Sequence, residues 1–498
     1  MTPQEWERYR QQAAQAWQQI QSPTRPVIWV STDSGALGAG AAATLREVER
    51  WVASHGNEAV VRKTASFGTT WLEPVVDILK PGRPRITYGH ITADKVASLL
   101  DSYLAGDDPR ADLAYASFGE TEFRGISPLA QTDWWRLQHR ILLARCGWTD
   151  PESLEDYVAT GGYSAFTKAL LEMSQEEVIQ QVKDSNVRGR GGAGFPAGIK
   201  WESAHSERSR PKFIICNSHE GEPNVFKDRR LMEGDPHGML EGVMIAAYAV
   251  GSEHAYVYIG SEYPLAIGRV QKAVRDLNAV GLLGKDVLGT GFNLKIKVIP
   301  GAGAYISGEA SAAIYGIQGQ RGMPRTKPPR SAEAGLWGKP TVVNNTETLA
   351  NVPHIVLHGS EWYRALGTEK STGTKLFSLA GDINRVCLAE LKMGCTLRDL
   401  IFVTGGGMRD GARFRSVLAG GISGGALPES ALDLTNEFGT LETEGSMMGS
   451  GGYLIYDEGT CMVDLAYYCT RFNRDESCGK CVPCRVGTAS QLNMLEDI

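Results

Sequence analysis

Three cysteines near the end of the chain have the spacing of a metal centre. Cys478, Cys481 and Cys484 are each separated by two residues, so one short turn can place three thiolates around a cubane iron–sulfur cluster. Structural zinc sites usually join two distant C-x2-C pairs, which favours a [4Fe-4S] cluster over zinc, the main alternative. A fourth thiolate is expected after Cys484, yet none precedes Ile498. We therefore expect a truncated cluster segment, or a cluster that is incomplete or absent.

The remaining cysteines give no sign of a disulfide framework. Five of the nine cysteines lie between Cys461 and Cys484, and none precedes Cys146. Such bunching is typical of a metal site rather than of a disulfide scaffold. Cys461 and Cys469 lie upstream of the spaced run and are expected to be buried core thiols.

A glycine-rich segment, Arg188–Trp201, is the second candidate for chemistry. Residues 189–198 include five glycines, and glycine permits left-handed backbone angles and close approach of a ligand. Free backbone N–H groups that lead into a helix bind anions well. The segment therefore predicts a loop for the phosphate or ring of a nucleotide or flavin. A tight turn packed against a strand is the alternative.

Three polar clusters complete the set of candidate sites. An expected strand at 212–216 leads into Asn217–Asp228, and α/β sheets place ligand contacts at such strand ends. A solvated acidic turn is the alternative there. A strand at 294–299 leads into a second glycine loop, Gly301–Glu309. Paired Asn and Thr side chains in Thr341–Thr348 suit phosphate oxygens, but they equally suit a plain helix cap.

The elements that surround these clusters alternate between strand and helix. The pattern predicts a further strand at 255–259 and helices at 239–250 and 266–280. This alternation indicates a parallel sheet covered by helices on both faces. Residues 373–435 instead combine short strands, such as 375–380, with Gly-rich turns, which suggests a separate β-rich domain.

Size and composition define the broad class. A chain of 498 residues should hold several domains, because one core rarely exceeds ~250–300 residues. The net charge of −6 gives no basic footprint for nucleic acid. No apolar run approaches the ~20 residues that cross a bilayer, and the N-terminus lacks the pattern of a signal peptide. A cytoplasmic protein without a transmembrane segment is expected.

The N-terminal part predicts a small α/β unit. The expected elements are helices at 4–20, 41–54 and 94–104 and strands at 27–30, 59–63, 74–79 and 85–88. This order resembles the thioredoxin-like ferredoxin domain of NADH-dehydrogenase-type proteins, in which cysteines of two loops bind a [2Fe-2S] cluster. Here the two loops, Ser31–Gly38 and Thr64–Thr70, contain no cysteine, and such clusters need Cys or His ligands. We expect a structural or docking role without a cluster.

Residues 107–183 are expected to connect this unit to the glycine loop. Asp108-Pro109, Ser127-Pro128 and Thr160–Gly162 break the segment into short pieces. Helices are predicted at 131–143 and 176–183.

The glycine loop, the three polar clusters and the cysteine run together resemble the FMN/NADH-binding (51 kDa-type) flavoprotein subunit of respiratory complex I, NAD-dependent hydrogenases and formate dehydrogenases. The match covers roughly residues 184–488, with these five motifs in the family's order. The resemblance implies an α/β fold class with a Rossmann-like FMN domain, preceded by a thioredoxin-like ferredoxin-fold domain and followed by a β-grasp (SLBB) domain and a helical iron–sulfur bundle. The expected boundaries are an N-terminal helix at 1–25, the thioredoxin-like domain without cluster cysteines at 26–106, the helical connector at 107–183, the FMN-binding domain at 184–360, the SLBB-like domain at 361–441 and the truncated [4Fe-4S] cluster domain at 442–498.

The resemblance also assigns site residues. Hydride transfer is carried by FMN, so no side chain is expected to be catalytic. The residues expected to contact FMN are Gly189, Arg190, Gly191, Gly192, Asn217, His219, Tyr305, Gly308, Glu309, Asn344, Asn345 and Thr348. Those expected to contact the nicotinamide nucleotide are Phe195, Lys200, Glu220 and Glu222, and the expected metal ligands are Cys478, Cys481 and Cys484.

The chain departs from the family pattern at four positions. His219 stands where Asp is usual, and a group that gains positive charge near pH ~6.5 would raise the flavin potential by favouring the reduced anion. Ala310 stands where a second Glu is usual. Ser203 and Arg330 replace aromatics that would sandwich the adenine, and each lost stack costs ~1–3 kcal/mol. NADH binding is therefore expected to weaken, and Arg330 would suit the 2′-phosphate of NADPH.

The main functional hypothesis is a flavin and iron–sulfur electron-transfer subunit of a multi-subunit oxidoreductase. Such an NADH-dehydrogenase-type subunit would pass electrons between NAD(P)H and a [4Fe-4S] cluster through FMN. One alternative is a flavin subunit with a degraded NADH pocket that serves another redox partner, and another is a scaffold without cofactors. The expected partners are other iron–sulfur subunits, including a thioredoxin-like ferredoxin subunit, and no nucleic acid.

Overall fold

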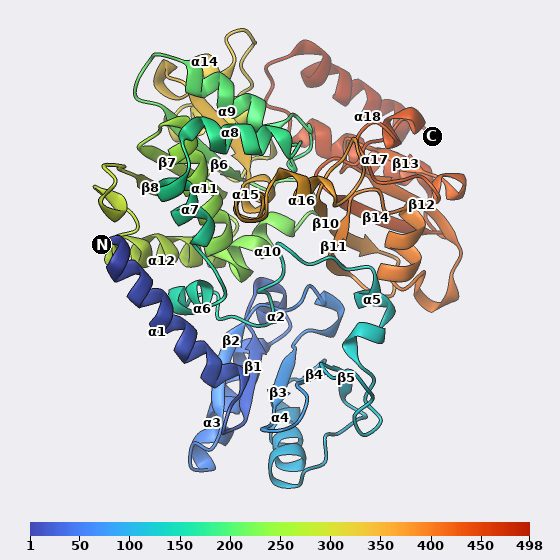
Figure 1. Ribbon diagram of the computed structural model, residues 1–498. Coiled ribbons are helices and arrows are strands. Elements are labelled where there is room, and N and C mark those ends of the chain that lie inside the picture. Colours follow the sequence, from blue (N-terminus) through green and yellow to red (C-terminus); the bar gives the residue numbers. More distant parts are fainter.

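The computed structural model describes residues 1–498 and contains three β-sheets. In Figure 1, the N-terminal sheet lies at the bottom, the parallel sheet at the upper left, and the third sheet beside it at the right. The three sheets follow one another along the chain, and each has a core of its own.

The N-terminal sheet has the strand order β2-β1-β3-β4-β5, and only β1 and β2 run parallel. Its strands are β1 (Val27–Ser31), β2 (Val60–Thr64), β3 (Val76–Leu79), β4 (Ile86–Tyr88) and β5 (Ala114–Ser117), and its helices are α2 (Ser34–Gly38), α3 (Ala41–Ser54) and α4 (Ala93–Leu100). Ile28 of β1 and Ile78 of β3 belong to the same core as Leu99 of α4. The four expected strands and two expected helices are confirmed, and α2 and β5 are additional.

The first helix, α1 (Pro3–Gln21), packs mainly on the connector, although Trp17 near its end lies beside Arg62 of β2. It lies against α6 (Leu154–Ala159), where Tyr9 Oη donates a hydrogen bond to Glu155 (3.0 Å). Trp6 is buried and meets the ring of Tyr163 edge-on. The apolar face of α1 therefore ties the start of the chain to the middle of the molecule.

The prediction of a helix at 131–143 is wrong, because only α5 (Asp133–Arg136) forms there. The backbone N–H groups of Ile141, Leu142 and Leu143 instead donate to the carboxylate of Glu390 (3.0–3.1 Å). Glu390 is fully buried in β11, and a buried carboxylate needs such donors. This long-range contact overrides the local helix preference. The connector also contains α7 (Ser164–Glu172) and α8 (Gln175–Asp184), and α8 matches the second expected helix.

The parallel sheet has the strand order β8-β7-β6-β9. Its strands are β6 (Phe213–Ser218), β7 (His254–Gly260), β8 (Lys295–Gly301) and β9 (Thr341–Asn345). Its helices are α9 (Ala197–Ser206), α10 (Lys227–Gly234), α11 (Pro236–Val250), α12 (Pro264–Val280), α13 (Ala310–Ile317), α14 (Ser331–Ala334), α15 (Thr346–His358) and α16 (Ser360–Arg364). Along β6, Ile214 and Cys216 enter one core and Phe213 and Ile215 enter another. The expectation of a parallel sheet covered on both faces is confirmed.

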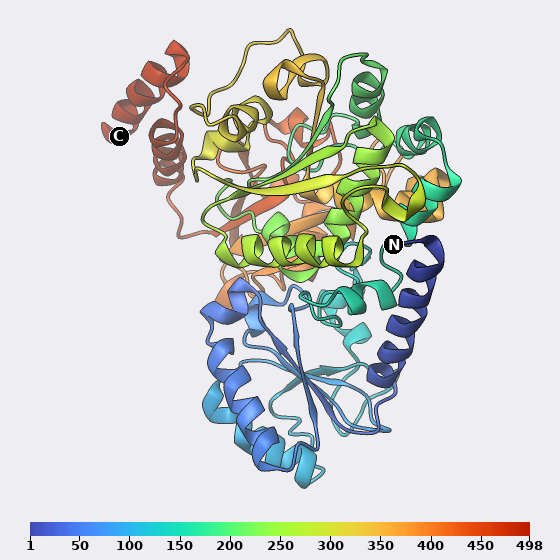
Figure 2. The same cartoon turned by 90° about the vertical axis from the view of Figure 1, so that its left-hand side faces the viewer.

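The third sheet has the order β11-β10-β14-β12-β13. Its strands are β10 (Thr374–Gly381), β11 (Cys387–Lys392), β12 (Phe414–Ala419), β13 (Gly425–Leu427) and β14 (Gly452–Asp457), and two helices follow, α17 (Met462–Asp475) and α18 (Thr488–Glu496). These two helices pack on each other and extend from the edge of the molecule (Figure 2). Each buries only one side chain, Leu465 in α17 and Leu492 in α18.

The two N-terminal loops without cysteine lie against α10. Arg230 of α10 forms ion pairs with Asp33 of one loop and with Glu73, which follows the other loop (2.8 Å). Glu233, also in α10, accepts a hydrogen bond from the backbone N–H of Ser34 (2.8 Å). The loops are therefore a contact surface between the N-terminal sheet and the helices of the parallel sheet.

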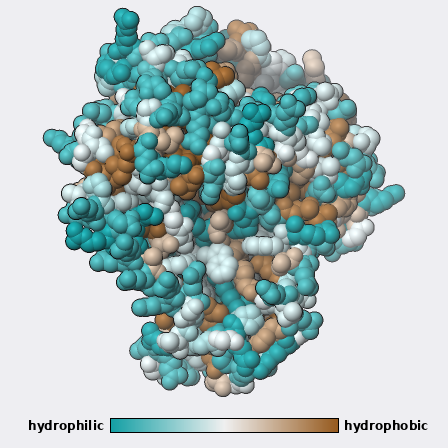
Figure 3. Space-filling model, in the orientation of Figure 1, coloured by the Kyte–Doolittle hydropathy of each residue, from teal (hydrophilic) through white to brown (hydrophobic).

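The face of the molecule in Figure 3 is mostly hydrophilic, with small apolar patches scattered among polar side chains. Among the helices, none combines the length and the apolar character that crossing a membrane requires.

Candidate functional site

The glycine loop and two of the polar clusters meet at the carboxyl ends of β6 and β9. The Arg190 N–H donates to Thr348 Oγ1 (2.8 Å), and Trp201 Nε1 donates to Asn344 Oδ1 (2.9 Å). A Cβ atom placed on Gly191 would lie 3.0 Å from the Cβ of Asn345. Glycine allows this close approach without a clash, so the loop and the Asn–Thr cluster form one surface.

The second glycine loop joins the same edge of the sheet through Asn217. Asn217, at the end of β6, donates from Nδ2 to the carbonyl of Gly308 (2.8 Å). Its Oδ1 accepts from the His219 N–H (3.3 Å). Because the carboxyl ends of parallel strands share one edge, clusters that are far apart in the sequence come together there. The structure thus joins all three clusters to the glycine loop.

Several donors at this edge have no partner in the protein. Neither the Gly191 N–H nor the Gly192 N–H donates to any backbone acceptor, and the Nδ2 group of Asn344 is buried without an acceptor. Gly192 has a φ of +127° and open space where its side chain would be. Gly191 is exposed and Gly192 is half-buried, so the Asn344 amide is the unpaired buried donor of the three, and buried polar groups are normally hydrogen-bonded. Unpaired donors beside a loop of glycines fit the phosphate and carbonyl oxygens of a flavin mononucleotide.

The Arg190 side chain does not line this open side. It is 1% exposed, and its guanidinium donates to the carbonyls of Thr372 (2.7 Å) and Thr374 (3.2 Å) and to Tyr363 Oη (3.2 Å). All three partners lie in or next to the third sheet or α16. The Arg190 side chain therefore anchors the loop and does not reach the expected flavin site.

His219 is buried beside the second glycine loop with both ring nitrogens unpaired. It is 7% exposed, and its ring lies parallel to that of Tyr258 at 6.0 Å. Burial lowers the pKa of His219, although Glu262 and Glu476 oppose this shift. Burial therefore favours the neutral imidazole and opposes the expected positive charge. The remaining difference from the family pattern is that position 219 has no carboxylate.

The two carboxylates expected to contact the nucleotide are both held by the protein. Glu220 accepts from the N–H groups of Asp228 (2.9 Å) and Arg229 (3.0 Å) at the start of α10. Burial, and then Asp228, raise the pKa of Glu220 to about 7. Glu222 accepts from Tyr305 Oη (2.6 Å) and from the Ile422 N–H (2.5 Å), and burial raises its pKa.

An acidic cleft of about 510 Å³ lies beside these two carboxylates. Glu220, Glu222 and Glu262 line it together with Tyr305 of the second glycine loop and Glu476 at the end of α17. The Tyr305 N–H donates to Glu476 (2.9 Å), so the C-terminal helices contact the parallel sheet next to this cleft.

Two cations and an aromatic ring lie on the other side of the glycine loop. Lys200 Nζ contacts the carbonyl of Val343 (3.3 Å) and lies 5.7 Å from the centre of the Phe195 ring. Phe195 is 44% exposed. Burial, and then Lys327, lower the pKa of Lys200. Glu309 caps α13 through the N–H groups of Ser311 and Ala312 and lies 4.0 Å from Lys327.

The three spaced cysteines lie between α17 and α18 and do not converge. Cys481 and Cys484 are exposed and Cys478 is half-buried, and Cys484 Sγ lies 3.2 Å from Ser477 Oγ. Nowhere in residues 1–498 do three Cys, His, Asp or Glu side chains gather into a metal-binding group. The residue types of this short segment fit a cluster, and the NADH-dehydrogenase-type resemblance would assign the three thiols to it.

The expectation that the two upstream cysteines are core thiols is wrong. Cys461 is exposed and Cys469 is half-buried, because α17 packs on the rest of the molecule only along one edge.

Sequence reasoning missed the buried charges behind the glycine loop. Lys227 and Asp228 of α10, Glu347 of α15 and Lys375 of β10 are each at most 3% exposed. The apolar pattern of β10 gave no sign of Lys375. Lys227 and Asp228 do belong to the polar cluster after β6, but the sequence did not indicate that they begin helix α10.

Two family models match the chain. The Nuo51 FMN-binding domain matches residues 182–354, which include the glycine loop and the three polar clusters. The NADH-ubiquinone oxidoreductase-F iron-sulfur binding region matches residues 464–498, which include the three spaced cysteines.

The chain is also similar to curated relatives and to solved structures. The chain is 47% identical over 370 residues to the NADP-reducing hydrogenase subunit HndC of Solidesulfovibrio fructosivorans, covering 74% of this chain and 75% of the relative. It is 46% identical over 358 residues to the F 2 subunit of the NADH-quinone oxidoreductase of Rhizobium meliloti (strain 1021), covering 72% and 85%. A chain of an NAD+-reducing [NiFe]-hydrogenase in the air-oxidized state aligns with a TM-score of 0.63 at 29% identity, over 95% of this chain and 76% of that chain.

Proposed function

The chain belongs to the family of F-type flavoprotein subunits of NADH-quinone oxidoreductases and related hydrogenases, and we propose that it passes electrons between NAD(P)H and a [4Fe-4S] cluster through FMN held at the glycine loop. It is an FMN and iron–sulfur electron-transfer subunit of a multi-subunit oxidoreductase. The observation that carries the proposal is the group of unpaired donors at Gly191, Gly192 and Asn344.

The role of the protein in this proposal is to hold and orient the flavin. FMN, when bound, accepts a hydride from a nicotinamide and releases electrons singly. The N–H groups of Gly191 and Gly192 and the Nδ2 group of Asn344 would donate to its oxygens. Asn217 holds the second glycine loop opposite them, and Tyr305 Oη keeps its proton on a hydrogen bond to Glu222.

The nucleotide would approach over the exposed side of the glycine loop. The exposed ring of Phe195 offers a stacking surface, and Lys200 and Lys327 offer cations for phosphates. Glu222, which is fixed by Tyr305, would stand at the border between flavin and nucleotide. Arg330 is exposed at the start of α14, where it is free to meet a 2′-phosphate.

We further propose the domain assignment given by the family resemblance. Residues 26–106, which hold β1 to β4 of the N-terminal sheet, would be a thioredoxin-like domain that serves as a docking unit, a role that the Arg230 ion pairs support; β5 of the same sheet lies beyond this range. Residues 184–360 would be the FMN-binding domain. The expected boundary at 441 is wrong, because β14 (Gly452–Asp457) lies in the middle of the third sheet; the SLBB-like domain would therefore include this strand, and the iron–sulfur domain would begin after it. The partners would be iron–sulfur subunits, one of them a thioredoxin-like ferredoxin.

A second candidate keeps the flavin but takes electrons from another donor. The observation in its favour is Glu220, because both of its carboxylate oxygens already accept hydrogen bonds from the start of α10. Ser203 and Arg330 at the expected adenine-stacking positions support the same candidate.

Anaerobic addition of NADH or NADPH to the purified, FMN-loaded protein separates the two candidates. Loss of the flavin absorption band supports the proposed function, and the more effective nucleotide identifies the substrate. A bound flavin that neither nucleotide bleaches would support the second candidate. Protein that cannot bind FMN at all would refute both.

A further inference from the structure

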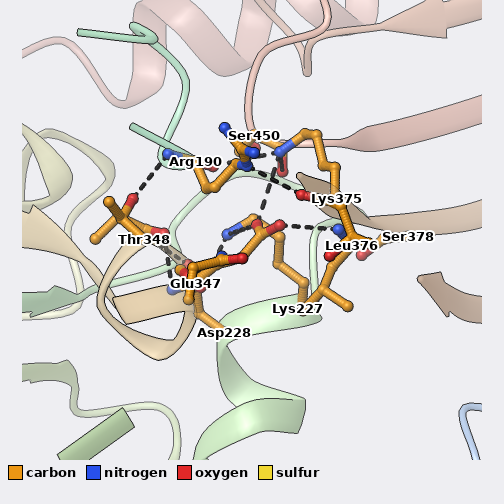
Figure 4. A network of polar contacts seen from close by, with 12 residues as sticks. Arg190, Lys227, Asp228, Glu347, Thr348, Lys375, Leu376, Ser378 and Ser450 are labelled. Carbon is orange, nitrogen blue, oxygen red and sulfur yellow. Dashed lines mark hydrogen bonds and ion pairs between the residues drawn. The ribbon is translucent and has the colours of Figure 1, made fainter. Parts of the chain in front are cut away.

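A cluster of buried charges lies behind the glycine loop, where the third sheet meets α10 and α15. Its members are Lys227, Asp228, Glu347 and Lys375, which we call the buried cluster; Figure 4 shows them together with Arg190 of the loop. Charged side chains are seldom buried unless they are paired. The contacts inside the cluster explain what each charge does.

Glu347 is the anionic centre of the buried cluster. Its Oε1 accepts from the Leu376 N–H of β10 (2.8 Å), and its Oε2 lies 3.1 Å from Lys227 Nζ and 3.7 Å from Lys375 Nζ. Lys227 also pairs with its neighbour Asp228 (2.8 Å). Glu347 therefore binds α10, α15 and β10 to one another.

Lys375 extends this cluster to the loop itself. Its Nζ donates to the carbonyl of Arg190 (3.4 Å) and to that of Ser450 (3.0 Å). The N–H of Arg190 is held from another side by Thr348 Oγ1 (2.8 Å). Both polar backbone atoms of Arg190 are thus fixed by side chains from outside the loop.

Fixing the Arg190 carbonyl also fixes the direction of the next N–H group. In a trans peptide the C=O and the following N–H lie in one plane and point in opposite directions. The Arg190 carbonyl points toward Lys375, so the Gly191 N–H points away from the buried cluster. That N–H has no backbone acceptor.

We propose that Lys375 is a positioning residue for the flavin, because it holds the Arg190–Gly191 peptide plane with the Gly191 N–H turned toward the ligand. Lys375 belongs to the third sheet, so this sheet takes part in shaping a site that lies on the parallel sheet. The inference rests on the proposed binding of FMN at the glycine loop.

Stability alone does not account for an ammonium group at this position. Burial, together with the nearby cations Lys227 and Arg190, lowers the pKa of Lys375 to about 7, although Glu347 and Asp228 oppose this shift. Replacing buried charges by apolar side chains of similar size is often neutral or stabilising. The fold does not require the charge, whereas a hydrogen bond to the Arg190 carbonyl does require a donor.

The test compares two Lys→Met variants as apoproteins titrated with FMN, with quenching of flavin fluorescence as the readout. K375M should bind FMN at least ~10-fold more weakly than wild type, which corresponds to ~1.4 kcal/mol. K212M is the matched control, because Lys212 is 1% exposed and bonds the carbonyl of His205 at the opposite end of β6. It should keep the dissociation constant of the wild type.

A second variant guards against misfolding of K375M, in which Glu347 loses one of its two cations. In K375M/E347Q the carboxylate is removed as well, while a glutamine Oε1 can still accept from the Leu376 N–H. This variant should fold and still bind FMN at least ~10-fold more weakly. A folded K375M or K375M/E347Q with wild-type affinity would overturn the inference. Wild-type protein without FMN affinity would instead refute the proposed function.

Discussion

Replacing Arg230 by methionine should loosen the contact between the N-terminal sheet and α10. The Arg230 side chain is 5% exposed, and its partners Asp33 and Glu73 are 0% and 2% exposed. It also donates to Ser66 Oγ (3.2 Å) and Thr70 Oγ1 (2.8 Å). Without the guanidinium two carboxylates stay buried without their cation. Breaking such a buried pair costs ~3–5 kcal/mol.

Thermal unfolding measures this loss. A unit of 150–250 residues shifts by ~2–4 °C per kcal/mol, so the transition that includes the N-terminal sheet should fall by ~6–20 °C in R230M. R208M removes an exposed arginine and serves as the matched control with no shift. The triple variant R230M/D33N/E73Q removes the unpaired charges and should recover most of the loss. An R230M transition equal to that of R208M would refute the idea that these ion pairs hold the contact.

Three further predictions concern the site. In H219D a buried carboxylate replaces the imidazole, so the reduction potential of the flavin should fall. The expected decrease is on the order of 30 mV, which equals ~1.4 kcal/mol for two electrons. A redox titration that gives an equal or higher potential would contradict this prediction. Folding lowers the pKa of Lys375 from 10.5 to about 7. Between these two pH values the unfolded chain therefore binds more protons than the folded protein. Wild-type stability in urea should therefore rise from about pH 7 to 9 by up to ~1.4 kcal/mol per unit, and K375M should lack this rise. C481S should lower the iron content of protein reconstituted with iron and sulfide, whereas C387S, which changes a buried thiol in β11, should not.

Much of the architecture could be predicted from the sequence, because it depends on local periodicity. The alternation along β6 separates Ile214 and Cys216 from Phe213 and Ile215, and these pairs do enter different cores. The three polar clusters could be placed at one edge because parallel strands share their carboxyl ends. The segment 137–143 could not be predicted, since its course depends on Glu390, a residue far away in the sequence.

The candidate site could be predicted as a set of residues but not as a set of contacts. The unpaired Asn344 and the tight fit of Gly191 against Asn345 agree with the expected flavin site. The sequence carried no sign that the side chain of Arg190 turns to the third sheet, that Glu220 caps α10, or that burial favours a neutral His219. Each of these depends on a partner that only the fold brings near.

Titration of FMN into the apoprotein of wild type and of G191V tests the central claim most directly. A Cβ at position 191 would approach that of Asn345 to 3.0 Å, so valine must displace the loop whose N–H groups face the ligand. G268A changes a helical glycine with open space around its Cβ position and is the control. We predict binding of one FMN per chain by wild type and G268A, and at least ~10-fold weaker binding by G191V. Equal affinity of all three proteins would contradict a flavin site at the glycine loop.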